Sequence, residues 1–378
     1  MALEIARWLA EFPVRQHCLY LNHAAVAPLP ARVADAMRTR IDEQERSGGK
    51  SWDAWRQTDL SIRSLAAQLV GGRPEDVSIV RSTSEGLSLV AQGLDWRPGD
   101  AVLVGEQEFA ANVAPWLALG GRGVEVRRYP ARDGRIAADD VIPMLAPPVR
   151  VLALSWVAFH TGWVAPVAEL AEAARARGIV VVLDAIQGLG ALPEAIGELG
   201  VDALVADGHK WLLGPEGAGV LVTTPELRAR LTPVLAGWRN VRHRPGDLFL
   251  DDLEFLADGR RFEPGSPASV LHAGLAAALD LILEAGIGDV HERVTANARS
   301  VTETLLRRGW EVGSPGSGHP IAGIVAGRHP FLPPAEVVRR LRDRSIEASS
   351  RQGWVRLSPH FYATAGEIEA LHAILGKL

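Results

Sequence analysis

Short apolar runs alternate with amphipathic segments along the chain up to about residue 225. Runs that are apolar throughout, such as Val151–Leu154 and Ile179–Leu183, are typical of strands buried on both faces. Helical patterns lie between most of the runs, for example Pro166–Arg177 with Gly178 as its C-cap. The pattern predicts an α/β fold with a mostly parallel sheet of seven strands. These strands are Val77–Arg81, Ala101–Gly105, Val124–Tyr129, Val151–Trp156, Ile179–Asp184, Ala203–Ala206 and Ala218–Thr223.

The alternation weakens after about residue 225, which predicts a second domain. Pro, Gly and Arg crowd Pro233–Gly265, and a long apolar helix follows over about Ala268–Ala285. We predict a large domain over residues 15–240 and a smaller α+β domain over 241–378, with residues 1–14 packing against the smaller domain. Two helices near Arg32–Arg46 and Trp52–Val70 are expected to pack on the large domain.

Composition narrows the class of protein. The 378 residues are 47 % apolar and 22 % charged, which is typical of a soluble globular protein. A net charge of -5 gives no reason to expect a nucleic-acid or membrane-surface partner. Cys18 is the only cysteine, so no disulfide framework or multi-cysteine metal site is expected. Glu4 and Arg7 interrupt the N-terminal apolar stretch, and no apolar run reaches about 18 residues, so we expect a cytoplasmic protein without a signal peptide.

Lysine is almost absent from the chain. Of 40 basic residues only Lys50, Lys210 and Lys377 are lysines, and the others are arginines. Only the primary amine of lysine can lose its proton and form a Schiff base, so a lysine inside such a chain is a candidate for chemistry. Lys50 stands in a glycine loop and Lys377 is penultimate, which leaves Lys210, just after a predicted strand.

An acidic residue follows the preceding predicted strand in the same way. Asp184 ends Ile179–Asp184, and Lys210 follows Ala203–Ala206. Ligands of open α/β sheets bind beyond the carboxyl ends of the strands. A lysine amine and a carboxylate at that edge are what pyridoxal phosphate (PLP) needs, one for a Schiff base and the other for its pyridinium nitrogen. A helix-capping aspartate and a solvated lysine are the alternative.

A phosphate site is predicted after the first core strand. The segment Arg81–Gly86 carries the hydroxyls of Ser82, Thr83 and Ser84 where a helix begins. Hydroxyls and free N–H groups at a helix N-terminus bind phosphate. An ordinary Ser/Thr N-cap is the alternative, and His209 beside the lysine could donate to the same phosphate.

Three motifs together resemble the class V aminotransferase family of fold-type-I PLP enzymes. They are Asp184-Ala185-Ile186-Gln187, Asp207-Gly208-His209-Lys210 and Gly214-Pro215-Glu216-Gly217. The resemblance extends from Tyr20–Ala25 to Val355–Ser358. This family includes cysteine desulfurases, kynureninases and isopenicillin N epimerase-like proteins. The resemblance implies the fold-type-I architecture, made of a large domain with a seven-stranded sheet and a smaller α+β domain, with PLP as cofactor and an α-amino acid as substrate.

The resemblance also implies roles for individual residues. For the cofactor these are Lys210 as the Schiff-base lysine, Asp184 at the pyridine nitrogen, Gln187 at the phenolic oxygen, and Thr83, Ser84, His209 and Asp207 at the phosphate. Phe109 would present its ring to the cofactor face, and Ser266 would reach the phosphate of the neighbouring subunit, which implies a homodimer with shared sites. Arg356 would hold the substrate α-carboxylate. Asn22 and Trp156 are expected to line the pocket.

Some residues differ from those typical of particular enzymes in the family, and these differences indicate which reaction to expect. Persulfide-forming desulfurases need a cysteine on a loop that corresponds to about Ile346–Trp354, where this chain has only Ser349 and Ser350. Phe109 replaces a histidine frequent in desulfurases, and His209 replaces a tyrosine typical of kynureninases. The pattern is therefore most similar to the isopenicillin N epimerase-like group.

The expected function is a PLP-dependent transformation of an α-amino acid, in which Lys210 removes the α-proton to give a Cα carbanion. Epimerase-like or lyase chemistry is favoured. An aminotransferase, a kynureninase- or desulfurase-type enzyme and a non-catalytic PLP-binding protein are the alternatives. The substrate stays open, with Trp238, Arg239 and His243 as candidates for specificity.

Overall fold

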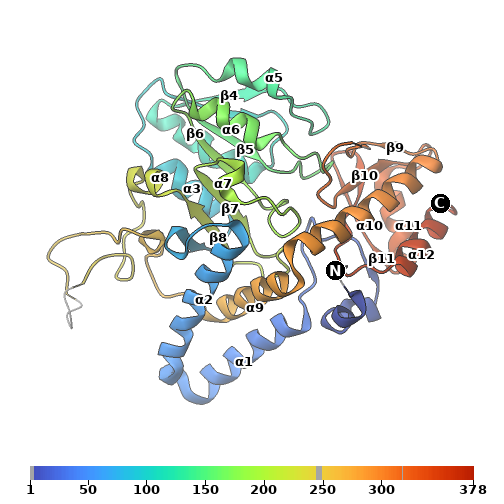
Figure 1. Cartoon of the computed structure of the whole chain (residues 1–378), viewed down its shortest axis with the longest axis horizontal. Coiled ribbons are helices and arrows are strands. Elements are labelled where there is room, and N and C mark those ends of the chain that lie inside the picture. Colours follow the sequence, from blue (N-terminus) through green and yellow to red (C-terminus); the bar gives the residue numbers. More distant parts are fainter. Residues whose placement is uncertain (1–3, 244–248, 317) are drawn as a thin grey trace.

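A computed structural model describes residues 4–243, 249–316 and 318–378 (Figure 1). A seven-stranded sheet dominates the first part of the chain, and β8 is the one strand of this sheet that runs antiparallel to its neighbours, β2 and β7. The predicted seven-stranded, mostly parallel α/β sheet is thus confirmed. In spatial order its strands are β2 (Val77–Val80), β8 (Gly219–Thr223), β7 (Ala203–Asp207), β6 (Val180–Asp184), β5 (Val149–Ser155), β3 (Ala101–Gly105) and β4 (Glu125–Tyr129).

Alternate residues of the central strands enter two different hydrophobic clusters, one on each face of the sheet. In β6, Val181 and Leu183 belong to one cluster, whereas Val180 and Val182 belong to the other. This is why the runs are apolar at every position. The first cluster also takes side chains from α2 (Trp52–Val70), α6 (Val167–Arg175) and α9 (Ser269–Ala285). The second takes them from α3 (Thr83–Gly93), α4 (Ala114–Leu117) and α8 (Pro225–Arg230).

Helix α9 packs against α2 and α1 (Ala31–Ser47), and these helices lie below the sheet in Figure 1. The next helix, α10 (Ile287–Arg307), leaves α9 at an angle of 82°. Among the described residues, no single helix is long and apolar enough to span a membrane. The bent pair α9–α10 would pass that test by length and composition only. Two shorter helices are α5 (Ala138–Val141) and α7 (Ile196–Leu199).

The C-terminal part forms a second, antiparallel sheet with its own core. Its strands, in spatial order, are β12 (Ser349–Arg351), β13 (Trp354–Leu357), β10 (Val325–Arg328) and β9 (Glu311–Val312). Helices α10, α11 (Pro334–Arg342) and α12 (Ala365–Leu375) also contribute to a third hydrophobic cluster. A two-residue turn joins β12 to β13, and both its residues have positive φ, 49° at Gln352 and 81° at Gly353. Such turns match the twist of a hairpin.

The N-terminal segment lies on this C-terminal part. Strand β1 (Leu19–Tyr20) pairs in parallel with β11 (Ile346–Glu347). The ring of Phe12 stacks on Tyr362 with 3.6 Å between centroids, and Trp8 meets Phe361 edge-on. Trp8, Phe12, Phe361 and Tyr362 all belong to the first hydrophobic cluster, that of the large sheet. The assignment of residues 1–14 to the smaller domain and the boundary at 240/241 stay predictions.

Candidate active site

A cavity of about 300 Å³ opens at the carboxyl edge of the large sheet. Its walls include Ser82–Ser84 after β2, Phe109 after β3, Asp184 at the end of β6 and Asp207–Lys210 at and after the end of β7. Parallel strands deliver these distant residues to one edge. The N-terminal residues Ala24–Val26 and, from the second sheet, Arg351 and Arg356 complete the walls, with Ala111, Phe159, Ile186 and Gln187.

Asp184 has one buried oxygen without a partner. It is 1 % exposed; its Oδ1 accepts a hydrogen bond of 3.0 Å from the Ile186 amide, whereas Oδ2 has no partner. Burial raises the pKa of Asp184 to about 7, with a smaller contribution from the charge of Glu108. A pyridinium N–H is a donor that would satisfy Oδ2 and keep the carboxylate ionised, so this residue fits PLP.

Lys210 lies in the same cavity. Burial lowers the pKa of its amine to about 8, although the nearby Asp184 carboxylate acts in the opposite direction. Its Nζ lies 5.9 Å from the centre of the Phe109 ring. A lysine with a lowered pKa has a larger neutral fraction near pH 7, which is the form that attacks an aldehyde.

Gln187 is held in one orientation. Its Nε2 donates to the Ala24 carbonyl at 2.9 Å, and its Oε1 accepts from Trp211 Nε1 at 2.9 Å. The second Nε2 hydrogen therefore stays available to an oxygen in the cavity, as the predicted contact with a phenolic oxygen requires.

The N-terminus of α3 opens into the cavity. The Ser82 hydroxyl caps the helix by accepting from the Glu85 amide at 3.1 Å. Thr83 Oγ1 accepts from the Asp207 amide at 3.2 Å, so its own hydrogen can be donated to a phosphate. The exposed Ser84 also lines the cavity, and these groups fit an anion.

His209 and Asp207 have different expected roles at the predicted phosphate site. His209 Nδ1 is 3.1 Å from Asp207 Oδ2, within ion-pair distance but without hydrogen-bond geometry. The other Asp207 oxygen accepts from the Gly208 amide at 2.7 Å. Because a carboxylate would repel phosphate, Asp207 is better placed to orient His209 and Thr83 than to contact the phosphate itself.

The Phe109 ring faces the cavity and is anchored from behind. It is 47 % exposed and meets Phe159 edge-on, with 5.2 Å between centroids. The preceding residue, Glu108, has a buried carboxylate that accepts from the Ser155 amide at 2.8 Å and from the Tyr129 hydroxyl at 3.3 Å. Glu108 was not predicted as a site residue, since nothing in the neighbouring sequence shows that three strand ends converge on it.

Arg356 presents an unsatisfied donor edge. The residue is 2 % exposed, and its Nη1 donates to the Phe159 carbonyl at 2.7 Å, while Nε and Nη2 are buried without partners. Burial, with the charge of Arg351, lowers its pKa to about 9, so the group is still cationic near pH 7. Nε–H and Nη2–H form the fork that binds a carboxylate with two parallel hydrogen bonds.

Arg351 is a second guanidinium in the cavity wall that the sequence analysis did not single out. Its Nη1 donates to the Ser350 carbonyl at 2.8 Å, and no carboxylate in the described part of the chain forms a salt bridge with it. Because arginine is frequent in this chain, its residue type alone does not mark it as a site residue. It lies in the cavity wall because it is next to the turn between β12 and β13.

Three expected residues are not brought into this cavity. Trp156 is 1 % exposed and packs in the core against Gly188, so the prediction that it lines the pocket is wrong. Asn22 is half-buried, bridges Ser358 through its backbone, and is not in the wall. Ser266 is exposed and outside this chain's cavity, as a residue that reaches a neighbouring subunit would be.

Known proteins with the same architecture are numerous. An uncharacterized aminotransferase, YcbU of Bacillus subtilis, is 27 % identical over 96 % of this chain and 94 % of its own. The apo structure of a cysteine desulfurase from Thermococcus onnurineus NA1 superposes with a TM-score of 0.90 at 25 % identity, covering 100 % of this chain and 98 % of its own. The cystine C–S lyase C-DES in complex with its product cysteine persulfide gives the same TM-score and identity, over 97 % and 99 %.

The sequence also matches the family described as aminotransferase class-V over residues 19–371, which is nearly the whole chain. This match agrees with the fold and with the lysine, the aspartate and the hydroxyl groups gathered at one sheet edge. The chain therefore belongs to the class V aminotransferase family and is a PLP-dependent enzyme.

Proposed function

We propose that this enzyme is a C–S lyase that cleaves the Cβ–S bond of a sulfur-containing amino acid without a protein-bound persulfide. The observation that carries the proposal is the two-residue turn at Gln352-Gly353, at the place where persulfide-forming desulfurases would need a cysteine loop. The only thiol of the chain, Cys18, is not in the cavity wall. The three relatives named above have aminotransferase, desulfurase and lyase names, which supports the lyase expectation better than the epimerase one.

The bound cofactor would supply an electron sink for the negative charge that develops at the substrate Cα. Lys210, Asp184 and Gln187 would hold its ring, with Thr83, Ser84 and His209 at its phosphate. The chemistry of the chain itself begins at Arg356, whose free donor edge binds the substrate α-carboxylate.

Lys210 moves the proton. Its Nζ, neutral in a larger fraction than an ordinary lysine because burial lowers its pKa to about 8, takes the proton from Cα and holds it as an ammonium. The Cβ–S bond then breaks and the sulfur leaves with the bonding electrons. With one water consumed, cystine gives pyruvate, ammonia and cysteine persulfide, and cysteine gives pyruvate, ammonia and hydrogen sulfide. Phe109 places an apolar ring beside Nζ, where it has no proton to exchange.

Arg351 favours cystine over cysteine as the substrate. Cystine has a second carboxylate at the far end of its disulfide, and Arg351 is a cation in the same cavity without a carboxylate partner among the described residues. An ionic hydrogen bond there contributes about 1.5–3 kcal/mol, or roughly tenfold to a hundredfold in kcat/KM. Cysteine cannot form this contact.

Product analysis tests the proposed reaction. The PLP-loaded enzyme is incubated separately with cystine, cysteine, alanine and glutamate, and pyruvate, enantiomers and pyridoxamine phosphate are measured. We expect pyruvate from cystine at the highest rate and none with Lys210→Ala. Inversion of the α-carbon without pyruvate would instead identify an epimerase, and stoichiometric pyridoxamine phosphate an aminotransferase.

A homodimer with shared sites is part of the proposal. Exposed apolar side chains gather near the cavity mouth and on α2, among them Val26, Trp52, Leu60 and Trp238. A second cavity of about 500 Å³, beside α2, is lined by Trp52, Trp55 and Trp238 together with charged residues such as Arg56, Asp59 and Arg260. Exposed aromatic side chains mixed with arginines are typical of a protein interface. Ser266, exposed outside its own cavity, would complete the phosphate site of the other subunit.

A further inference from the structure

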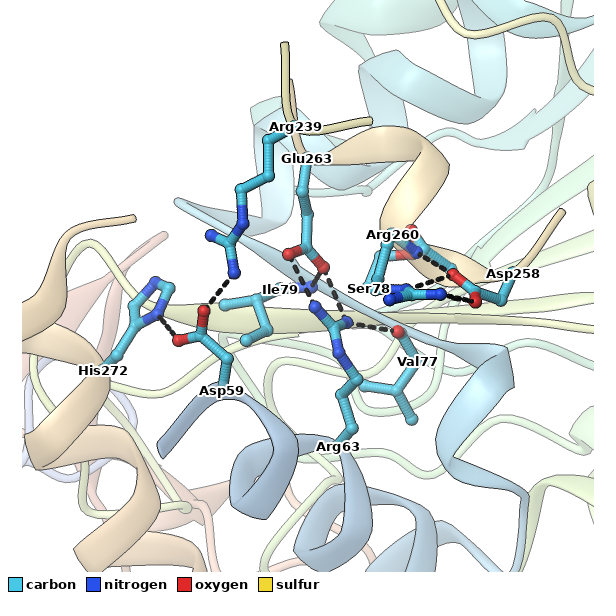
Figure 2. Close-up of polar contacts among 11 residues, drawn as sticks. Asp59, Arg63, Val77, Ser78, Ile79, Arg239, Asp258, Arg260, Glu263 and His272 are labelled. Atoms are coloured by element: carbon cyan, nitrogen blue, oxygen red, sulfur yellow. Dashed lines mark hydrogen bonds and ion pairs between the residues drawn. The ribbon is translucent and has the colours of Figure 1, made fainter. Parts of the chain in front are cut away.

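A buried ion pair holds the segment that leads to Ser266 (Figure 2). Arg63 of α2 donates to both carboxylate oxygens of Glu263, at 2.7 Å each, and their side chains are 5 % and 6 % exposed. This is the bidentate, fork-to-fork geometry of a strong charge-assisted contact. Glu263 stands three residues before Ser266.

The same pair is bound to the outer edge of β2. Arg63 Nη1 donates to the Val77 carbonyl at 2.8 Å, and Glu263 Oε1 accepts from the Ile79 amide at 2.8 Å. The Ser78 hydroxyl donates to the carbonyl of Gly259, a residue that shortly precedes Glu263 in the sequence, at 2.7 Å. Since β2 is the last strand of the sheet on this side, these bonds fasten the segment to a rigid element (Figure 2).

A second ionic group lies at Asp59, earlier on the same helix α2. Asp59 accepts from His272 Nδ1 at 2.6 Å and pairs with Arg239 (Figure 2). The Arg239 amide donates to the Pro264 carbonyl at 3.2 Å, and that carbonyl lies so close to Gly237 that a Cβ there would be 2.1 Å from it. The backbone is thus fixed immediately before Ser266, and Ser266 itself projects into solvent.

We infer that Glu263 and Arg63 are positioning residues for the active site of the neighbouring subunit, because they fix the loop that presents Ser266 across the dimer. This inference rests on the shared-site homodimer proposed above. Stability alone does not explain such a pair, because a buried ion pair can often be replaced by packed apolar residues without loss. Its geometry instead sets the position of Pro264 and Ser266 relative to the sheet. A substitution of Glu263 should therefore weaken cofactor binding in the site of the neighbouring subunit.

Mixed dimers with one cofactor-competent subunit test the inference. Two differently tagged chains are co-expressed and the mixed dimer is purified, with Lys210→Ala in one chain so that only the other forms the visible Schiff base. In the trans arrangement Glu263→Gln is placed in the Lys210→Ala chain; in the cis arrangement it is placed in the Lys210 chain. Both dimers contain one Lys210→Ala and one Glu263→Gln substitution, so any general loss of stability is the same in both.

We expect the apparent PLP affinity, measured by visible absorbance, to fall about tenfold in the trans arrangement and to stay near that of the unmodified dimer in the cis arrangement. Glu254→Gln, an exposed partner of Arg242 in the same segment, is the matched control and should change neither. A loss that follows the cis arrangement would overturn the inference.

Ser266→Ala in the same two arrangements separates this inference from the proposed function. A trans effect of Ser266→Ala with a cis effect of Glu263→Gln would leave the shared site standing and reject only the positioning role. If Ser266→Ala has no trans effect, the shared site fails, and the positioning role fails with it.

Discussion

Lys210 is the residue on which the assignment depends most, and its protonation can be followed directly. Burial lowers the pKa of its amine to about 8, and only the neutral amine attacks PLP. We expect the rate at which the apoprotein takes up PLP to rise with pH and to be half-maximal near pH 8, in stopped-flow absorbance. Asp184→Asn removes a carboxylate that favours the ammonium form, so the midpoint should move to lower pH. A midpoint near 10.5, the ordinary value, would show that the amine is not desolvated.

After borohydride reduction, peptide mass spectrometry should find the pyridoxyl group on Lys210. Lys50→Arg and Lys377→Arg should keep the label and the activity. A label on either of those two lysines would reject the whole site.

Arg356 should determine substrate binding. Replacing it with lysine keeps the charge but loses the Nε–H and Nη2–H fork, so KM for the amino acid should rise about tenfold to a hundredfold. PLP affinity should hardly change, because Arg356 lies on β13, in the wall formed by the second sheet. Steady-state kinetics and PLP titration separate the two effects. An unchanged KM would move the carboxylate site elsewhere.

Cys18 should be dispensable. Burial and the neighbouring Glu347 carboxylate raise the pKa of its thiol, so little thiolate is present near neutral pH. Cys18→Ser should keep the rate of pyruvate formation, and intact-protein mass spectrometry should find no added sulfur after incubation with cysteine. A persulfide on Cys18 together with inactivity of the serine variant would assign the enzyme to the desulfurases.

At the scale of elements, the first turn of helix α3 is the proposed phosphate site. Thr83→Val removes a hydroxyl that can donate into the cavity, and we expect PLP affinity to fall about tenfold. Pyridoxal, which lacks the phosphate, is the control ligand, and its affinity should be nearly the same for both proteins. An equal loss for both ligands would mean that the substitution disturbs the site generally.

The elements were predictable because their patterns are local. All seven predicted strands form, and Val77–Arg81 exceeds β2 by one residue only. Motif residues such as Lys210 and Asp184 could be predicted to lie in one cavity for the same reason, while their roles stay predictions. Glu108 and Arg351 could not, because their roles come from strand ends and a hairpin that meet only in the fold. Trp156 was misplaced since a sequence does not show on which side of a strand end the ring falls.

At the scale of the molecule, the proposed sites need two subunits. We expect a dimer at micromolar concentration in analytical ultracentrifugation. Trp238→Asp, in the exposed apolar surface, should produce monomers, because an unpaired charge in an interface is costly. These monomers should bind PLP more weakly than the dimer, whereas Phe331→Asp, at another exposed aromatic, should leave both properties unchanged. A monomer with full PLP affinity would contradict the shared site.

The two-residue turn between β12 and β13 has a consequence beyond the molecule. A swinging sulfur carrier needs a flexible loop, and Gln352-Gly353 is too short to be one. Under the proposed reaction the released sulfur compound therefore escapes by diffusion, and whatever uses it must capture it from solution. Transfer of this compound to a second protein should become slower on dilution, and a small reagent that reacts with persulfide or sulfide should prevent it. Direct transfer inside a protein complex would be affected neither by dilution nor by the reagent.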